Sequence, residues 1–315
     1  MLLISQMFLV VVLFFWNGTF GNVKNCFFTS NFLFGSYSPN FLIGGGAIFW
    51  NGADGILTNS IFISTAAEVT GGGVVWNGES GFLSSSTFKD NNAGVHGGGV
   101  FWVGAKGNLT SSTFINNTAI NSGGAICWVS VNGTISNSNF TANTAKANGG
   151  GVYLNSANCT LTNCNFNGNT ASGGGAILWN SAGTNGILTN STFISNTATN
   201  NGGAVHWNGA NSNMTDCKFT SNNAVNGDNV YWRWTVDEFL NKYGQINDYD
   251  YVYIWNGVGT PNSTIILNKK GITISSQGNV VFDGQGKNLH FEITGSDVLI
   301  EYLTFRNFNF IYKKL

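Results

Sequence analysis

A repeat of about 26 residues runs through most of this 315-residue chain and constrains its fold more than any other feature. The string GGAIFWN at 45–51 recurs in altered form, and the Ile or Val after its glycines returns every 25 to 28 residues. This first column consists of Ile48, Val74, Val100, Ile126, Val152, Ile177, Val205 and Val230. Such a period is typical of solenoids, in which each repeat packs only against its neighbours.

Further columns occupy fixed places in each repeat. A small residue precedes each Phe by two positions, Asn follows three positions later with Thr65 as the exception, and Ala follows five positions later. The Leu-like column is Leu57, Leu83, Leu109, Ile135, Leu161, Leu188 and Met214. The Phe column is Phe62, Phe88, Phe114, Phe140, Phe166, Phe193 and Phe219. The Asn column is Asn91, Asn117, Asn143, Asn169, Asn196 and Asn222, and stacked Asn side chains at a turn can bond from coil to coil.

The chemistry of these columns predicts an all-β chain, a parallel β-helix with one coil of about 26 residues per repeat. The period is too short for two helices with their turns, and β-branched residues suit strands. Leu and Phe supply two strand regions with a bend between them. Each coil buries about one Ile or Val, one Leu and one Phe, worth roughly 2 kcal/mol each, so coils are stable only when stacked.

Trp recurs two residues after the Ile or Val, at 50, 76, 102, 128, 179, 207 and 232, with Leu154 breaking the run. Residues two apart share a face of a strand. We expect Trp to point inward with Ile or Val, and the column between them to point outward. That outward column is Phe49, Val75, Phe101, Cys127, Tyr153, Leu178, His206 and Tyr231. The reverse arrangement would expose a stripe of Trp suited to stacking on sugars.

Charged residues make up only 9% of the chain, against roughly 25% in an ordinary domain, and the net charge is −1. No basic field exists to hold phosphates, which excludes nucleic acid as a partner. A low content of charged residues also follows from this fold, because a charged side chain repeated in a column would lie directly beside the same charge in the next coil.

The repeats GGA[I/V] and FxxN resemble those of chlamydial polymorphic outer-membrane proteins. GGA[I/V] occurs at Gly45–Ile48, Gly123–Ile126, Gly174–Ile177 and Gly202–Val205, and FxxN begins at Phe28 and at six Phe from Phe88 to Phe219. The Asn-, Thr- and Gly-rich setting resembles more closely the adhesin-like surface proteins of methanogenic archaea, as does Gly271–Asn307. The resemblance implies a right-handed, pectate-lyase-like β-helix and a place at the cell surface.

The chain divides into four segments in this interpretation. Residues 1–16 form an apolar, signal-like segment that runs into the first coil, and 17–234 form the repeat array. Residues 235–270 form a connector or cap, in which Thr235 and Glu238 predict a capped helix ending at Gly244, followed by a strand over 249–255. Residues 271–315 form further coils, and we expect the chain to be a fragment of a larger surface protein.

The five cysteines are expected to be free thiols. Cys26, Cys164 and Cys217 take the place of Ser in the small column, and Cys164 and Cys217 are two coils apart, too far for a disulfide. Cys127 and Cys159 complete the set, and Cys159 could pair with Cys164 only with distortion. Nine Asn-x-Ser/Thr sequons begin at Asn17, Asn108, Asn116, Asn132, Asn139, Asn158, Asn190, Asn213 and Asn262.

We predict a non-catalytic, cell-surface or extracellular adhesin-like rod that binds a host or neighbouring cell surface or its glycans. Anchoring to a membrane or cell wall would go through segments outside this sequence. The alternatives are a carbohydrate-active lyase or hydrolase and a passive spacer. Asp54 and Glu79 are the one carboxylate pair on the same turn of neighbouring coils; a Ca²⁺ site there is an open alternative, but it is short of ligands. His96 and His206 are expected to be structural, so no catalytic, cofactor or metal site is predicted.

Overall fold

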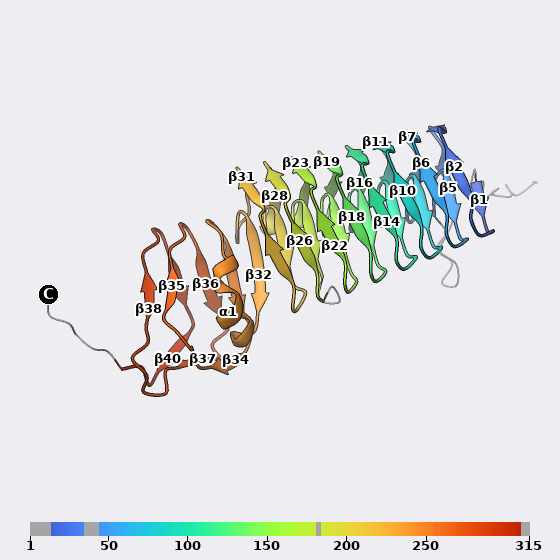
Figure 1. Ribbon diagram of the computed structural model, residues 1–315. Helices are drawn as coiled ribbons and strands as arrows, with labels where there is room; N and C mark the ends of the chain where they lie inside the picture. Colours follow the sequence, from blue (N-terminus) through green and yellow to red (C-terminus); the bar gives the residue numbers. More distant parts are fainter. Residues whose placement is uncertain (1–13, 35–43, 181–183, 310–315) are drawn as a thin grey trace, which may run out of the picture.

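The computed structural model describes residues 14–34, 44–180 and 184–309, and it shows a long rod of stacked coils (Figure 1). Every strand pairing is parallel, and strands of successive coils pair in register, as Ile48 with Val74 and Trp50 with Trp76. The predicted columns are therefore straight lines of like side chains along the rod. This confirms the parallel β-helix with about 26 residues per coil.

Sheet A runs the length of the rod and carries the first and Trp columns. Its strands, in spatial order, are β1 (Phe14–Trp16), β5 (Ile48–Trp50), β9 (Val74–Trp76), β13 (Val100–Trp102), β17 (Ile126–Trp128), β21 (Val152–Leu154), β25 (Ile177–Trp179), β29 (Val205–Trp207), β32 (Val230–Trp234), β33 (Tyr251–Ile254), β36 (Thr273–Ser276) and β39 (Leu299–Glu301). Trp16 pairs with Trp50, so the first coil begins inside the apolar N-terminal run as predicted. Residues 1–13 of the predicted signal-like segment lie outside the described residues.

Sheets B, C and D form the other sides of the repeat array. Sheet B holds the Leu column in β2 (Asn22–Lys24), β6 (Ile56–Thr58), β10 (Phe82–Ser84), β14 (Asn108–Thr110), β18 (Thr134–Ser136), β22 (Thr160–Thr162), β26 (Ile187–Thr189) and β30 (Asn213–Thr215). Sheet C holds the Phe column in β3 (Phe27–Thr29), β7 (Ile61–Ile63), β11 (Thr87–Lys89), β15 (Thr113–Ile115), β19 (Asn139–Thr141), β23 (Asn165–Asn167), β27 (Thr192–Ile194) and β31 (Lys218–Thr220). Sheet D holds the Ala column in β4 (Phe32–Leu33), β8 (Ala66–Ala67), β12 (Asn92–Ala93), β16 (Thr118–Ala119), β20 (Thr144–Ala145), β24 (Thr170–Gly173) and β28 (Thr197–Asn201).

Each corner of a coil is made by a residue with left-handed backbone. In the third coil these are Ser80, Ser85, Asp90 and Gly97, with φ between 49° and 66°. Small polar residues and glycine adopt this conformation most readily, which explains why Asn, Ser, Asp and Gly fill the corner columns.

The interior holds the Trp side chains, and in the coils of Trp50 to Trp128 each one fits against a glycine five residues further on. Trp179 fits against Gly186, and Trp207 is followed at the same place by Ser212. A Cβ on Gly81 would fall 2.1 Å from the Trp76 ring nitrogen, and one on Gly107 would fall 2.4 Å from the Trp102 ring. Neighbouring indoles stack with ring centres 4.7 Å apart, as Trp76 does on Trp102. All seven Trp of the predicted column are fully buried, so the inward orientation is confirmed.

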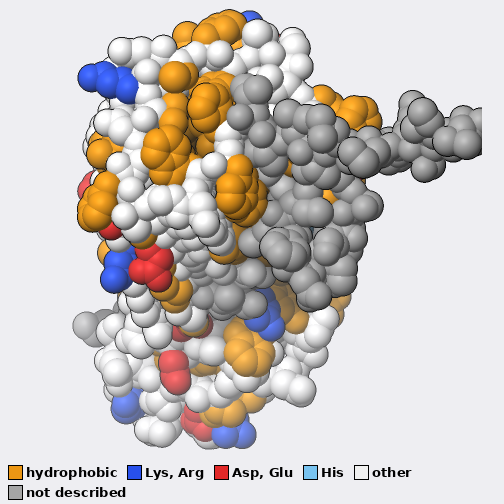
Figure 2. Space-filling view, turned by 90° about the vertical axis from the view of Figure 1, so that its right-hand side faces the viewer, with side chains coloured by type: hydrophobic (Ala, Val, Ile, Leu, Met, Phe, Trp, Pro, Cys, Tyr) orange, Lys and Arg blue, Asp and Glu red, His pale blue; other side chains and the backbone are white. Residues whose placement is uncertain are grey.

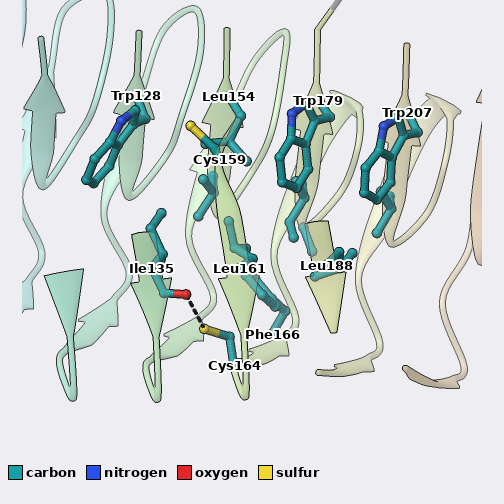
Figure 3. Packing of buried hydrophobic residues seen from close by; sticks show 14 of the residues in the cluster. Trp128, Ile135, Leu154, Cys159, Leu161, Cys164, Phe166, Trp179, Leu188 and Trp207 are labelled. Atoms are coloured by element: carbon teal, nitrogen blue, oxygen red, sulfur yellow. Dashed lines mark hydrogen bonds between the residues drawn. The ribbon is translucent and has the colours of Figure 1, made fainter. Parts of the chain in front are cut away.

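One coil departs from this pattern at two places at once. Leu154 stands where the other coils have Trp, and Cys159 stands where most have Gly. Figure 3 shows the Cys159 side chain next to Leu154, in the row occupied by Trp128 and Trp179 in the adjoining coils. The two changes therefore compensate each other within one coil.

Two polar ladders are buried beside the apolar columns. Asn143 donates from Nδ2 to the Phe114 carbonyl and to Asn169 Oδ1, both at 3.0 Å, and its Oδ1 accepts two bonds from Asn117 at 2.9 Å. In the small column, Ser112 Oγ donates to the Thr110 carbonyl at 2.9 Å. The stacked Asn turn predicted from sequence is therefore a continuous hydrogen-bonded chain that satisfies buried backbone groups.

The column expected to point outward lies outside the main core, but much of it is covered. Val75, Phe101 and Cys127 are buried in a small cluster of their own, beneath the turn that leads back into sheet A. The His96 ring lies 6.1 Å from the Phe101 ring, and a Cβ on Gly71 would fall 2.7 Å from Val75. This covering turn is held by bridges from coil to coil, and it leaves other members of the column, such as Phe49 and Tyr153, only half-buried.

Helix α1 (Val236–Lys242) and the turn η1 (Tyr243–Gln245) follow β32. The predicted capping box is present, since Thr235 and Glu238 each cap the other's backbone. The expected helix stop was only partly right, because Gly244 follows the Tyr243 cap without left-handed backbone and the chain continues as η1. Lys242 donates to the Ser212 carbonyl at 3.0 Å and Gln245 accepts from the Met214 N–H, so this segment covers the edge of sheet B at β30.

The C-terminal coils continue sheet A through β33, β36 and β39. The strand expected over 249–255 is shorter, because Tyr249 has left-handed backbone and β33 spans Tyr251–Ile254. Two smaller sheets complete these coils: β34 (Gly257–Gly259), β37 (Val280–Asp283) and β40 (Thr304–Arg306), and β35 (Ile265–Leu267) with β38 (Phe291–Ile293). Figure 1 places α1 beside these strands, and its Phe239 ring meets Phe282 at 5.5 Å.

Candidate functional site

The candidate binding surfaces of this rod are its outward faces, because packed side chains fill the interior. From β6 to β30, sheet B carries one hydroxyl residue per coil at the same outward position, which we call the hydroxyl column, whereas β2 has Lys24 there. It consists of Thr58, Ser84, Thr110, Ser136, Thr162, Thr189 and Thr215. Some neighbours bond to each other, as Ser136 donates to Thr110 at 2.9 Å and Thr189 to Thr162 at 3.0 Å. This face presents a line of uncharged donors and acceptors, interrupted at Ser84, which is buried.

The rod surface carries few charges. Figure 2 looks at the end of the rod with the first coil and shows scattered charged side chains and several apolar patches. The exposed apolar residues of this coil include Phe15, Phe20 and Phe27. Contacts made by these faces therefore depend on hydrogen bonding and apolar packing rather than on charge.

Asp54 and Glu79 lie at one turn of neighbouring coils, as the sequence indicated. The Asp54 N–H donates to the Glu79 carbonyl at 2.9 Å, and the side chains are half-buried and exposed, respectively. Among the described residues, no group of three or more His, Cys, Asp or Glu gathers in a way that could hold a metal ion. The arrangement at this turn is that of solvated carboxylates on a left-handed corner.

His96 and His206 belong to the covered outer side of sheet A. Burial lowers the pKa of both imidazoles, that of His206 to about 4, and Nε2 of His206 lies 3.1 Å from Asn208 Oδ1. Both rings are therefore neutral near pH 7 and pack as structural groups.

All five cysteines are free thiols, as predicted. Burial raises the pKa of Cys164 to about 12 and that of Cys217 to about 11. Cys164 makes the same hydrogen bond as the Ser residues of its column, because its thiol donates to the Thr162 carbonyl. It forms no disulfide. These thiols are poor nucleophiles, because the thiolate form is disfavoured.

The outer face of sheet A becomes aromatic where the array meets the C-terminal coils. Tyr231 and Tyr251 stack with ring centres 5.2 Å apart, and the Arg233 guanidinium lies 4.8 Å from the Trp255 ring centre. A hollow of about 400 Å³ opens beside Tyr251. The alternation of Tyr in this segment predicted a strand, but sequence alone did not show that these rings share one surface with a hollow.

Asp250 is a second group that sequence analysis missed. It is buried, and it accepts hydrogen bonds from the Val230 N–H at 3.1 Å, the Trp232 indole at 2.9 Å and the Asn247 N–H at 2.9 Å. Burial nevertheless raises the pKa of this carboxyl to about 7. Asp250 therefore joins β32 to the next coil through a carboxyl that changes protonation near neutral pH.

Comparison with known proteins agrees with this geometry. Residues 72–237, just over half of the chain, match the family model described as the right handed beta helix region. The chain belongs to the right-handed β-helix family. No curated protein and no solved structure matches it.

The family match covers the β-helix coils from β9 to β32 together with the start of α1. It confirms the β-solenoid predicted from the columns and the right-handed coil that the resemblance implied. No helix in the described part of this β-helix is long and apolar enough to cross a membrane.

The sequons of the β-helix all have exposed Asn side chains. This holds for each of the nine, from Asn17 to Asn262, whereas the Asn ladder inside the coils is buried. Because these Asn side chains are exposed, they are accessible to glycosylation in a cell that carries it out.

Proposed function

We propose that this β-helix is a non-catalytic rod displayed at a cell surface, where it adheres to a host or neighbouring cell or to its glycans. The observation that carries the proposal is the hydroxyl column, which repeats one uncharged hydrogen-bonding group per coil on a stiff scaffold. Many weak, evenly spaced contacts along such a face add to a strong attachment. The resemblance of its repeats to those of methanogen adhesin-like and chlamydial surface proteins supports an extracellular location.

The stiffness needed for display follows from the stacking. Trp, Phe and Leu columns extend through successive coils without a break in register between β5 and β29. Each coil is held by the coils on both sides, so the exposed faces keep a fixed spacing. A preorganised face loses little conformational entropy on binding.

The test is binding of the purified rod to a glycan array and to cultured cells. The first variant, Thr110→Glu with Thr162→Glu, places two charges in the hydroxyl column. The matched control, Thr87→Glu with Asn139→Glu, places two charges on the outward face of sheet C.

The proposal predicts binding by the parent protein, a loss of at least tenfold in the sheet B variant, and a smaller loss in the control. Equal binding by both variants would show that the hydroxyl column does not take part in binding. Absence of any binding by the parent protein would favour a passive spacer. Release of reducing sugars from a polysaccharide, abolished by Asp54→Ala, would contradict a non-catalytic role.

A further inference from the structure

The covering turn over the outer face of sheet A ends before the sheet does. Along the array the turn passes from coil to coil through bridges such as Thr70 with His96, and its last bridge joins Asn201 to Asn226. Sheet A continues beyond it through β33, β36 and β39. The end of the turn at 224–228 forms one wall of the hollow of about 400 Å³, and the uncovered outer face of sheet A forms its floor.

The floor of this hollow contains a gap in a stack of side chains. Tyr231 and Tyr251 stack at 5.2 Å with an angle of 13° between the rings, and the next two residues in register are Thr273 and Leu299. Coils lie about 4.8 Å apart, so Leu299 stands roughly 10 Å from Tyr251 along the rod. Thr273 is too small to fill that distance, which leaves room for one ring against the free side of Tyr251.

The rim of the hollow is polar and acidic. Asp228 and Glu301 line it, and Asp228 is held in place because its Oδ1 accepts a bond from the Ala224 N–H at 2.8 Å. Carboxylates are acceptors for hydroxyl donors and repel anions. Tyr249 also lines the hollow, with the Lys270 ammonium 5.7 Å from its ring centre.

We propose that this hollow, lined by Tyr251, Thr273, Leu299, Asp228 and Glu301, binds one ring of a neutral saccharide. The C–H face of the pyranose packs on the Tyr251 ring and fills the gap above Thr273, while its hydroxyls donate to Asp228 and Glu301. An aromatic floor with a few fixed polar groups is typical of small-molecule sites. The acidic rim selects neutral sugars over uronic acids.

The inference rests on the proposed adhesive function, since it names a ligand for it, but the experiment separates the two. Saturation-transfer NMR on the full chain would be run with a panel of neutral hexoses, their oligosaccharides and the corresponding uronic acids. Thr273→Tyr fills the gap with a ring that continues the stack, so the fold is kept while the site is closed. Tyr253→Ala is the control, because it removes a neighbouring ring that lies outside the hollow.

The proposal predicts binding of at least one neutral saccharide, loss of that binding in Thr273→Tyr, and a change of less than threefold in Tyr253→Ala. Tyr251→Ala weakens binding at least tenfold. Undiminished binding in Thr273→Tyr, or stronger binding of uronic acids than of neutral sugars, would overturn it. Binding of cells by the parent rod with no saccharide bound in the hollow would overturn this inference and leave the adhesive function standing.

Discussion

The compensation between Leu154 and Cys159 gives a quantitative test of how the core is packed. In the coils of Trp76 and Trp128 the indole lies where a Cβ on the glycine five residues later would fall, at 2.1 Å for Gly81 and 2.5 Å for Gly133. A Trp at 154 would therefore overlap the Cys159 side chain. We expect Leu154→Trp alone to destabilise the rod by about 1–3 kcal/mol, the usual range for overpacking.

The reverse single change leaves a void. Cys159 is 1% exposed, and Cys159→Gly removes its buried side chain and loosens the backbone, for a loss of about 1–2 kcal/mol. The double variant restores the pattern of the other coils and joins Trp128 to Trp179 through a new indole. Each stacked pair contributes about 0.5–1.5 kcal/mol beyond burial, so the double variant should be at least as stable as the parent.

The assay is urea unfolding of the parent, both single variants and the double variant, followed by Trp fluorescence. We expect a favourable coupling energy of at least about 2 kcal/mol between the two positions. Cys164→Ser is the control, because it changes another buried thiol of the same coil to the residue common in its column. Additive effects of Leu154→Trp and Cys159→Gly would refute the packing argument.

Three further predictions concern buried polar groups and glycines. Asp250 has a pKa of about 7 in the fold against 3.8 in the unfolded chain, so its contribution to stability is largest below pH 4 and falls by up to roughly 4 kcal/mol as pH rises to 7. The unfolding free energy of Asp250→Asn relative to the parent should therefore increase across pH 4–7, and a flat difference would contradict the assignment. Asn143→Ala should cost about 3 kcal/mol or more in urea unfolding because it leaves buried partners unpaired, whereas Asn139→Ala on the exposed face should stay within about 0.5 kcal/mol. Gly107→Ala should lower the thermal midpoint through overlap with an indole, whereas Gly168→Asn, at a left-handed corner with open space, should leave it nearly unchanged.

The fold of the coil could be predicted from the sequence, because each column of repeated residues corresponds to one position in every coil. Ile48, Leu57 and Phe62 recur at one period, and only stacking of like on like explains such repetition. The pairing of Trp with a glycine five residues later was also visible in principle, since Leu154 and Cys159 change together.

The surfaces were harder to predict, because they depend on parts of the chain that do not repeat. Val75 alternates with buried neighbours and was expected to point outward, but the turn that covers it lies at the variable end of the repeat. Tyr251 and Thr273 share a column through register alone, with a spacing of 22 residues set by β34, β35 and the loops between them. Asp250 gave no signal, because a single acid in an irregular segment has no periodicity.

The most direct test of the stacked-coil account is a set of distances along one column. Thr29, Asn167 and Thr220 occupy the same outward position of sheet C, five and seven coils apart from Thr29. Spin labels introduced at these positions through a non-natural amino acid leave the cysteines untouched. Pulsed electron paramagnetic resonance should give backbone separations of roughly 24 Å and roughly 34 Å from position 29, at about 4.8 Å per coil. Distances that do not grow in equal steps with coil number would contradict the rod.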